Sequence, residues 1–210
     1  MINSKQELRF YIMADRIMNG LPPKRTLLEK IQSLLFHKHD IAVCLRLMRC
    51  ASYYKNKKDP SILDKICRKW FSFKYYHLSE KLGFCIGYDS FGYGLIIPHY
   101  GTIVINSKIR AGNYCVLHTS ICIGGSNKVF GDGLYMGAGA KIMGTLTLGN
   151  WVSVAANSLV NKSFGDNVLL AGMPAIIKRT NYPKWYERDG DIFLQRFLAV
   201  EKLKNKMFGI

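Results

Sequence analysis

Apolar residues in the first 82 positions recur at the three- and four-residue spacing of amphipathic helices. Ser4 followed by Glu7 resembles a capping box, which predicts a helix that begins there and carries Leu8, Tyr11 and Ile12 on its apolar face. The pair Pro22-Pro23 ends this helix, because proline lacks the amide hydrogen that an inner helical turn needs. Further helices are expected from Thr26, over 41–54 and over 61–82.

From Gly83 onward the helical spacing gives way to a period of six residues, and glycine becomes frequent. The leading apolar or small positions are Ile105, Ala111, Leu117 and Ile123 and, after a slip of one residue, Phe130, Met136, Ile142, Leu148, Val154 and Val160. A second inward series follows four residues later, at Ile109, Cys115, Ile121, Leu134, Ala140, Leu146, Val152, Ser158 and Phe164. Neither a helix nor a hairpin has this period, so it predicts stacked triangular coils. A glycine-rich antiparallel sandwich would instead alternate every second residue.

The chain is expected to leave the coil through Pro174 and to end in a helix. The apolar face of that helix would consist of Ile192, Phe193, Phe197, Leu198 and Leu203. We therefore predict a mainly β protein with three parts: an α-helical segment over 1–82, a parallel β-helix over 83–175, and an extension with a helix over 176–210.

The net charge of +16 is unevenly distributed along the chain. Residues 1–82 hold 17 Lys and Arg against 7 Asp and Glu, whereas residues 83–175 hold 5 against 3 and residues 176–210 hold 8 against 4. Basic flanks around a nearly neutral middle favour an anionic partner such as an acidic membrane surface, and a solvated face without a partner is the alternative. We expect no nucleic acid partner.

The other compositional features point to an ordinary folded protein. The N-terminus is polar and lacks the apolar core of a signal peptide, and no apolar stretch is long enough for a spanning helix. The six cysteines match neither a zinc site nor a CxxC motif, so we expect reduced thiols, a cytoplasmic location and no metal site.

Three motifs in the repeating segment carry a resemblance to a known family. They are Gly92-Tyr93-Gly94-Leu95-Ile96-Ile97-Pro98-His99 with Gly101-Thr102-Ile103-Val104-Ile105-Asn106, then Met136-Gly137-Ala138-Gly139-Ala140-Lys141-Ile142, and finally Ala171-Gly172-Met173-Pro174-Ala175. Together they are similar to the hexapeptide-repeat acyltransferases, in particular to the branch that resembles serine acetyltransferase. The matching stretch runs from about Gly83 to Arg179. The resemblance implies a left-handed coil, a homotrimer that could pair into a hexamer, and active sites between neighbouring coils.

The resemblance also assigns roles to individual residues. His99 matches the catalytic histidine, whose usual pKa of about 6.5 suits proton transfer near neutral pH. His118 could orient the acceptor or the thioester across the cleft, or could be a polar surface residue. The acetyl-CoA donor would lie along Ala138, Gly139 and Ala156, with Lys162, Lys178 and Arg179 near its phosphates. Apart from the resemblance, we assign Asp89 and Tyr100 to the acceptor. Asp89 is the nearest acid that could orient His99, and a role in a turn is the alternative.

The sequence departs from serine acetyltransferases at two positions that matter for the acceptor. Pro98 replaces the aspartate that precedes their catalytic histidine, and Phe84 replaces a further family acid. The loss of carboxylates that would bind a serine ammonium group favours a sugar hydroxyl of a surface polysaccharide or its precursor as the acceptor. Serine acetylation in cysteine biosynthesis is the alternative, and a non-enzymatic β-helix scaffold is a third reading.

Overall fold

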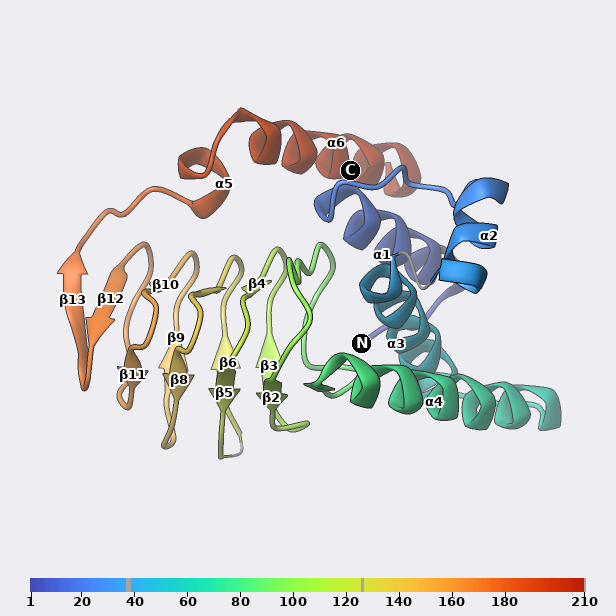
Figure 1. Cartoon of the computed structure of the whole chain (residues 1–210), viewed down its shortest axis with the longest axis horizontal. Helices are drawn as coiled ribbons and strands as arrows, with labels where there is room; N and C mark the ends of the chain where they lie inside the picture. The colour runs from blue at the N-terminus through green and yellow to red at the C-terminus, as the bar shows by residue number, and fades with distance from the viewer. Residues whose placement is uncertain (37–38, 126, 210) are drawn as a thin grey trace.

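A computed structural model of the chain describes residues 1–36, 39–125 and 127–209. It is a β-solenoid with helices packed against its first coil and a last helix that returns along one side (Figure 1). The helices are α1 (Lys5–Met18), α2 (Leu27–Phe36), α3 (Asp40–Asn56), α4 (Ile62–Leu82), α5 (Trp185–Arg188) and α6 (Asp191–Phe208). Short strands make up the solenoid: β1 (Phe84–Cys85), β2 (Ile103–Ile105), β3 (Arg110–Ala111), β4 (Val116–Leu117), β5 (Ile121–Ile123), β6 (Val129–Phe130), β7 (Tyr135–Met136), β8 (Lys141–Ile142), β9 (Thr147–Leu148), β10 (Ser153–Val154), β11 (Leu159–Val160), β12 (Leu169–Gly172) and β13 (Ala175–Arg179).

The strands form three sheets, one for each face of the triangular coil. Their orders are β1-β2-β5-β8-β11, β4-β7-β10-β12-β13 and β3-β6-β9. Every pairing is parallel except β12 with β13, as expected when successive coils stack in one direction. The leading positions of the six-residue repeat are buried, with Ala111 half-buried, so the prediction of a repeating coil is confirmed.

The start signals predicted for the helices are present in slightly altered form. The Ser4 side chain accepts a hydrogen bond from the Glu7 amide. The Glu7 carboxylate, however, accepts a hydrogen bond from the amide of Asn3 and not from that of Ser4. Ser61 and Asp64 form a complete capping box at the start of α4. Of the histidines in the helical segment, His39 is half-buried and His77 is exposed, and His37 lies outside the described residues.

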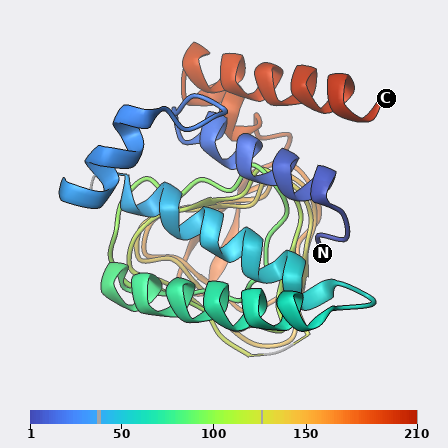
Figure 2. The ribbon, with the colours of Figure 1, turned by 90° about the vertical axis from the view of Figure 1, so that its right-hand side faces the viewer.

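Side chains of the helices cover the backbone of the first coil. Arg49 of α3 is 1% exposed and donates to the carbonyls of Phe91 (2.7 Å) and Gly92 (2.6 Å). It also pairs with the buried Asp15 of α1 at 2.8 Å, and Asp15 in turn accepts from the Leu95 amide at 3.0 Å. The buried Tyr75 of α4 donates to the Ile86 carbonyl at 2.7 Å. Figure 2 shows the helices lying across the end of the coil.

The other end of the solenoid differs from the prediction that the chain leaves the coil at Pro174. The chain makes a hairpin there, and β13 runs back antiparallel along β12 as far as Arg179. The final helical region is then anchored by Trp185, whose indole N–H donates to the Tyr114 carbonyl at 3.0 Å. Helix α6 packs along α1, so the two ends of the chain meet beside the first coil. No helix in the described part of the chain is long and apolar enough to cross a membrane.

Candidate active site

His99 lies on a turn that is longer than the turns at the same corner of the following coils. Ile96 pairs with Val116 and Ile103 with Ile121, so the turn between the paired residues holds six residues (97–102) in the His99 coil and four (117–120) in the next. The His99 turn is thus two residues longer than the next, and Pro98, His99 and Tyr100 are all exposed. The candidate base is therefore at the surface of the single chain and open to a substrate.

His118 lies on the next coil, close enough to His99 for the two rings to interact electrostatically. Burial lowers the pKa of His118 below its usual value, and the positive charge of His99 lowers it further. Its Nε2 lies 2.9 Å from the Tyr135 hydroxyl, and the two rings are 5.2 Å apart. The Arg188 guanidinium lies 5.0 Å from the centre of the Tyr135 ring. His118 is thus held by a polar cluster and is mainly neutral near pH 7.

The small residues assigned to the donor lie in one column beside these histidines. The pairings of Tyr135 with Ser153 and of Val154 with Leu170 place Ala138, Ala156 and Gly172 at equivalent positions in successive coils. The Asn157 amide bonds to the Ala138 carbonyl at 2.9 Å, and both alanines are exposed. Gly139 is buried with a φ of +72°, and an added Cβ would clash with Asn157 Oδ1, so the close approach of the next coil requires glycine there. The column gives a long flexible ligand access to the backbone.

The three predicted phosphate contacts do not lie in one place. Lys162 is on the turn after β11, with its ammonium 5.7 Å from the centre of the Phe164 ring. Lys178 and Arg179 are at the end of β13, and Arg179 pairs with Leu169, at the opposite end of the hairpin from Gly172. All three side chains are exposed. Among the described residues there is no group of three or more His, Cys, Asp or Glu side chains that could bind a metal ion.

Asp89 does not orient His99, contrary to the prediction. Its carboxylate accepts from Ser52 (2.6 Å) and Asn56 (2.9 Å) and pairs with Lys55 (3.0 Å), all on α3. These bonds lower the pKa of Asp89 against the opposing effect of burial. The sequence suggested Asp89 because it is close to His99 along the chain, but its role is to attach α3 to the first coil.

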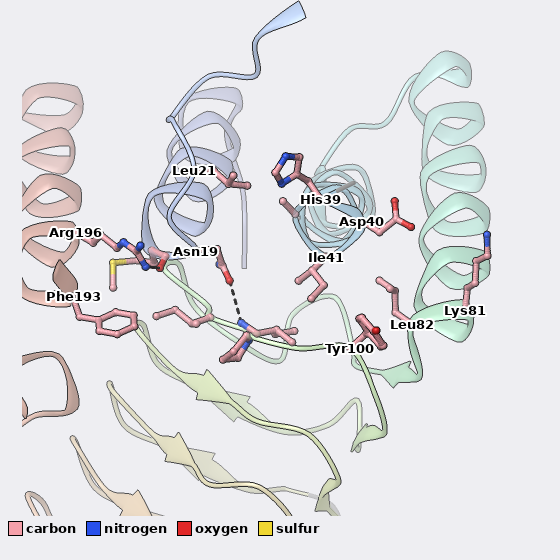
Figure 3. A pocket seen from close by; sticks show the side chains of 15 residues that line it. Asn19, Leu21, His39, Asp40, Ile41, Lys81, Leu82, Tyr100, Phe193 and Arg196 are labelled. Atoms are coloured by element: carbon pink, nitrogen blue, oxygen red, sulfur yellow. Dashed lines mark hydrogen bonds between the residues drawn. The ribbon is translucent and has the colours of Figure 1, made fainter. Parts of the chain in front are cut away.

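Tyr100, also assigned to the acceptor, lines a cavity of about 700 Å³ on the helical side of the turn. Figure 3 shows its walls coming from α1, α3, α4 and α6, with Tyr100 beside Leu82. Pro98 contributes to the lining, whereas the imidazole of His99 does not. The cavity therefore adjoins the turn without containing the candidate base.

The sequence did not indicate that three further residues lie in this region, namely Tyr135, Arg188 and Gly172. Tyr135 immediately precedes a leading apolar position, where the repeat alone predicts a surface residue of any type. Arg188 reaches Ser153 (3.3 Å) from a helix outside the repeat. Gly172 was recognised within a motif, but its position below Ala156 depends on the strand register.

Known proteins show both a sequence and a fold similarity. No protein-family model matches the chain. Serine acetyltransferases from Buchnera aphidicola (Acyrthosiphon pisum), Haemophilus influenzae and Escherichia coli K12 are 30%, 31% and 31% identical over 106, 93 and 93 residues. The chain is similar to serine acetyltransferases. The matches cover 46%, 41% and 41% of this chain but only 39%, 35% and 34% of those relatives' own lengths.

Solved structures extend the similarity to the whole architecture. Serine acetyltransferase from Brucella abortus strain S19 gives a TM-score of 0.57 at 21% identity, covering 82% of this chain and 67% of the other. The soybean apoenzyme gives 0.58 at 18%, covering 81% and 69%. At such identities the likeness establishes the fold alone, a β-solenoid with helices at both ends of the chain. None of these relatives or structures supports the sugar acceptor expected from the sequence.

Proposed function

We propose that the protein transfers an acetyl group from acetyl-CoA to a hydroxyl group, with His99 as the general base. The observation that carries this proposal is the exposed imidazole on the lengthened turn, beside His118 and the column of Ala138 and Ala156. The similarity to serine acetyltransferases supports the same chemistry. One solved serine acetyltransferase with this fold, at a TM-score of 0.51, is a complex with CoA.

The reaction needs one base that returns its proton. The His99 imidazole takes the proton of the acceptor hydroxyl as the oxygen attacks the thioester carbonyl carbon. The tetrahedral intermediate then expels the thiolate of coenzyme A, which receives the proton from the imidazolium, giving an O-acetyl ester and the free thiol. His118, mainly neutral, stands beside the reacting groups without adding a second positive charge.

The donor is proposed to lie along the Ala138–Ala156–Gly172 column. Side chains larger than alanine would separate a pantetheine arm from the backbone amides and carbonyls there. The exposed Lys162, Lys178 and Arg179 remain candidates for the nucleotide phosphates.

Free serine is the acceptor that the comparisons favour. The named relatives are serine acetyltransferases, and a soybean structure of the same fold (TM-score 0.57, 18% identity) is complexed with serine. A sugar hydroxyl is the second candidate, because Pro98 and the buried Phe84 supply no carboxylate for an ammonium group. The two acceptors differ in charge, so they can be distinguished directly.

We further propose that a neighbouring copy of the chain completes the site. Pro98, His99 and Tyr100 are exposed in the single chain, whereas catalysis of this type benefits from a cleft that excludes water. A homotrimer would supply the second wall of that cleft.

The test is release of free thiol from acetyl-CoA with L-serine or with a panel of sugars as acceptor. Replacing His99 by Asn should lower kcat by about 10²–10⁴-fold, the range of general-base catalysis, while acetyl-CoA binding measured by calorimetry persists. The matched control is His77→Asn, an exposed histidine on α4. Undiminished turnover in H99N would refute the mechanism, and turnover with sugars but not with serine would reverse the choice of acceptor.

A further inference from the structure

Helix α4 exposes large apolar side chains to solvent along most of its length. Ile62 is 77% exposed, Ile66 58%, Trp70 51% and Phe73 67%. Isolated exposed apolar residues are common, but a continuous row on one helix marks a surface that contacts something apolar. The contact of α4 with the solenoid is made by other residues of the helix. Tyr75 is buried and donates to the Ile86 carbonyl, and Phe71, Leu78 and Leu82 pack against the core.

The exposed residues lie on one face of the helix. At 3.6 residues per turn, Ile62, Ile66 and Phe73 follow one another along the same line, and Trp70 lies just beside it. We refer to these four residues as the α4 stripe. Helix α4 packs against α3 and β1 (Figures 1 and 2). The four side chains of the stripe are exposed to solvent, so they lie on the side of α4 that these contacts leave open.

Cationic side chains flank the α4 stripe on both sides. A groove of about 430 Å³ runs along one side, lined by Lys65, Arg68 and Lys69 of α4 together with Tyr54, Pro60 and Lys55. Lys55 is already paired with Asp89, so the three basic residues of α4 are the cations that face a ligand there. No carboxylate is among these lining residues in the described part of the chain. Lys74 is exposed on the other side of the stripe. An apolar stripe between cations is the pattern of helices that lie in the interface of an anionic bilayer.

We propose that this face of the protein docks on a membrane surface rich in anionic lipid, with the α4 stripe among the acyl chains and the groove around lipid phosphates. Charge argues for this occupant over a second copy of the chain. Two α4 faces packed together would bring Lys65, Lys69 and Lys74 against their counterparts. Asp64 is already paired with Lys57 at 2.6 Å. The exposed Glu80 lies on the same line as the stripe but at the far end of α4, so basic residues outnumber acidic ones on this face.

The experiment measures binding of the full-length chain to vesicles by sedimentation. Vesicles of equal parts phosphatidylglycerol and phosphatidylcholine should bind the protein, whereas vesicles of phosphatidylcholine alone should bind it at least tenfold more weakly. Raising the salt concentration should weaken binding, since screening reduces the attraction of basic residues to the surface. Trp70 adds a spectroscopic signal, because its emission should shift to shorter wavelength on binding, and the Trp70→Phe variant should lose that shift while still binding.

Two variants separate the contributions of charge and apolar surface. Replacing Lys65, Arg68 and Lys69 together by Gln should lower binding to anionic vesicles on the order of a hundredfold, from the usual contribution of each basic residue near a charged surface. Ile66→Ser with Phe73→Ser should lower it about tenfold or more. The matched control is Ile192→Ser with Leu198→Ser, two residues of α6 that are 54% and 56% exposed, and its binding should not change.

Three outcomes would overturn the proposal. The first is equal binding to anionic and neutral vesicles, and the second is no binding at all. The third is a change of molecular mass in I66S/F73S, measured by sedimentation velocity, with vesicle binding unaltered, which would make the α4 stripe an interface between copies. Circular dichroism of each variant verifies that α4 remains folded. Because the readout is vesicle binding, the result does not depend on acetyl transfer.

Discussion

Both ends of the solenoid have strand amides and carbonyls that no further coil pairs, and the two ends bond these groups in different ways. A stack of parallel strands leaves unpaired amides and carbonyls on its first and last coils. On the first coil, side chains of α1, α3 and α4 bond to these groups, with Arg49 bridging the carbonyls of Phe91 and Gly92. On the last coil, the backbone of β13 covers β12.

The two ends therefore differ in whether their stability depends on buried charge. The side-chain solution buries charge: burial raises the pKa of Asp15, and the neighbouring Arg49 counteracts that effect only in part. Such a pair is stable only while both members are present. The backbone solution uses no charged group and joins segments that are adjacent in sequence. The first coil should therefore be sensitive to single side-chain changes, and the last coil to backbone conformation.

The largest expected effect is at the Asp15–Arg49 pair. Arg49→Met should lower the free energy of unfolding by about 3–5 kcal/mol, because it leaves the Asp15 carboxylate buried without its partner. The measurement is chemical denaturation followed by circular dichroism. Arg9→Met, an exposed arginine on α1, is the control and should change stability by less than about 0.5 kcal/mol. A loss below about 1 kcal/mol in R49M would show that the pair does not hold the first coil.

Asn19 should have the next largest effect. Its side chain donates to the Leu95 carbonyl at 2.8 Å and accepts from the Ile97 amide at 3.2 Å (the contact drawn in Figure 3). Asn19→Ala leaves both backbone groups unpaired and should cost about 1–3 kcal/mol. Hydrogen exchange of the Ile97 amide should accelerate more than that of the Ile121 amide, which lies in the next coil. Equal acceleration at both would indicate a global effect and contradict a local role.

At the opposite end, the expected sensitivity is to backbone conformation. Gly172 has a φ of +110°, and an added Cβ would lie 3.2 Å from the Pro174 carbonyl oxygen. Gly172→Ala should therefore lower the melting temperature, with a cost of about 1–2 kcal/mol. Gly165→Ala is the matched control, since no atom lies within 4 Å of its added Cβ. If the two variants melt at the same temperature, the hairpin does not limit stability.

The smallest effect is expected at Tyr75. Tyr75→Phe removes one buried hydrogen bond to the Ile86 carbonyl and keeps the ring, so we expect a loss of about 1 kcal/mol. Tyr76→Phe, at an exposed neighbouring position (53% exposed), should be near neutral. A loss as large as that of Arg49→Met would mean that the neutral and the charged contacts of the first coil are not energetically different.

These contacts also mark where prediction from the sequence stopped. The repeat could be recognised because each coil places Ile123, Ile142 and Val160 in the same sheet by a rule that holds from coil to coil. The Asp15–Arg49 pair follows no rule of this kind. It joins residues 34 positions apart on two helices, and nothing in either helical pattern indicates a partner.

In the candidate site too, residues inside the repeat could be predicted, whereas contacts with the helices could not. His99, Ala138 and Ala156 were predicted because the repeating segment resembles a known family, and their roles in catalysis and donor binding remain proposals. Asp89 was assigned wrongly to the neighbourhood of His99, since only the packing of α3 reveals that Ser52, Lys55 and Asn56 bind it. The return of the chain along β12 was missed because Ile176 and Ile177 lie outside the six-residue period.

Because the turn that carries His99 is longer than its neighbours, the residues that meet a substrate there are separate from the residues that hold the coil in the stack. The strands before and after it keep the register of their neighbours, so the exposed Pro98 and Tyr100 on either side of His99 can be exchanged without displacing a buried side chain of the stack. Acceptor preference could thus diverge by substitution within that short segment while the framework stays constant. Proteins with this architecture would be able to acquire new substrates by substitutions on a single turn of the coil.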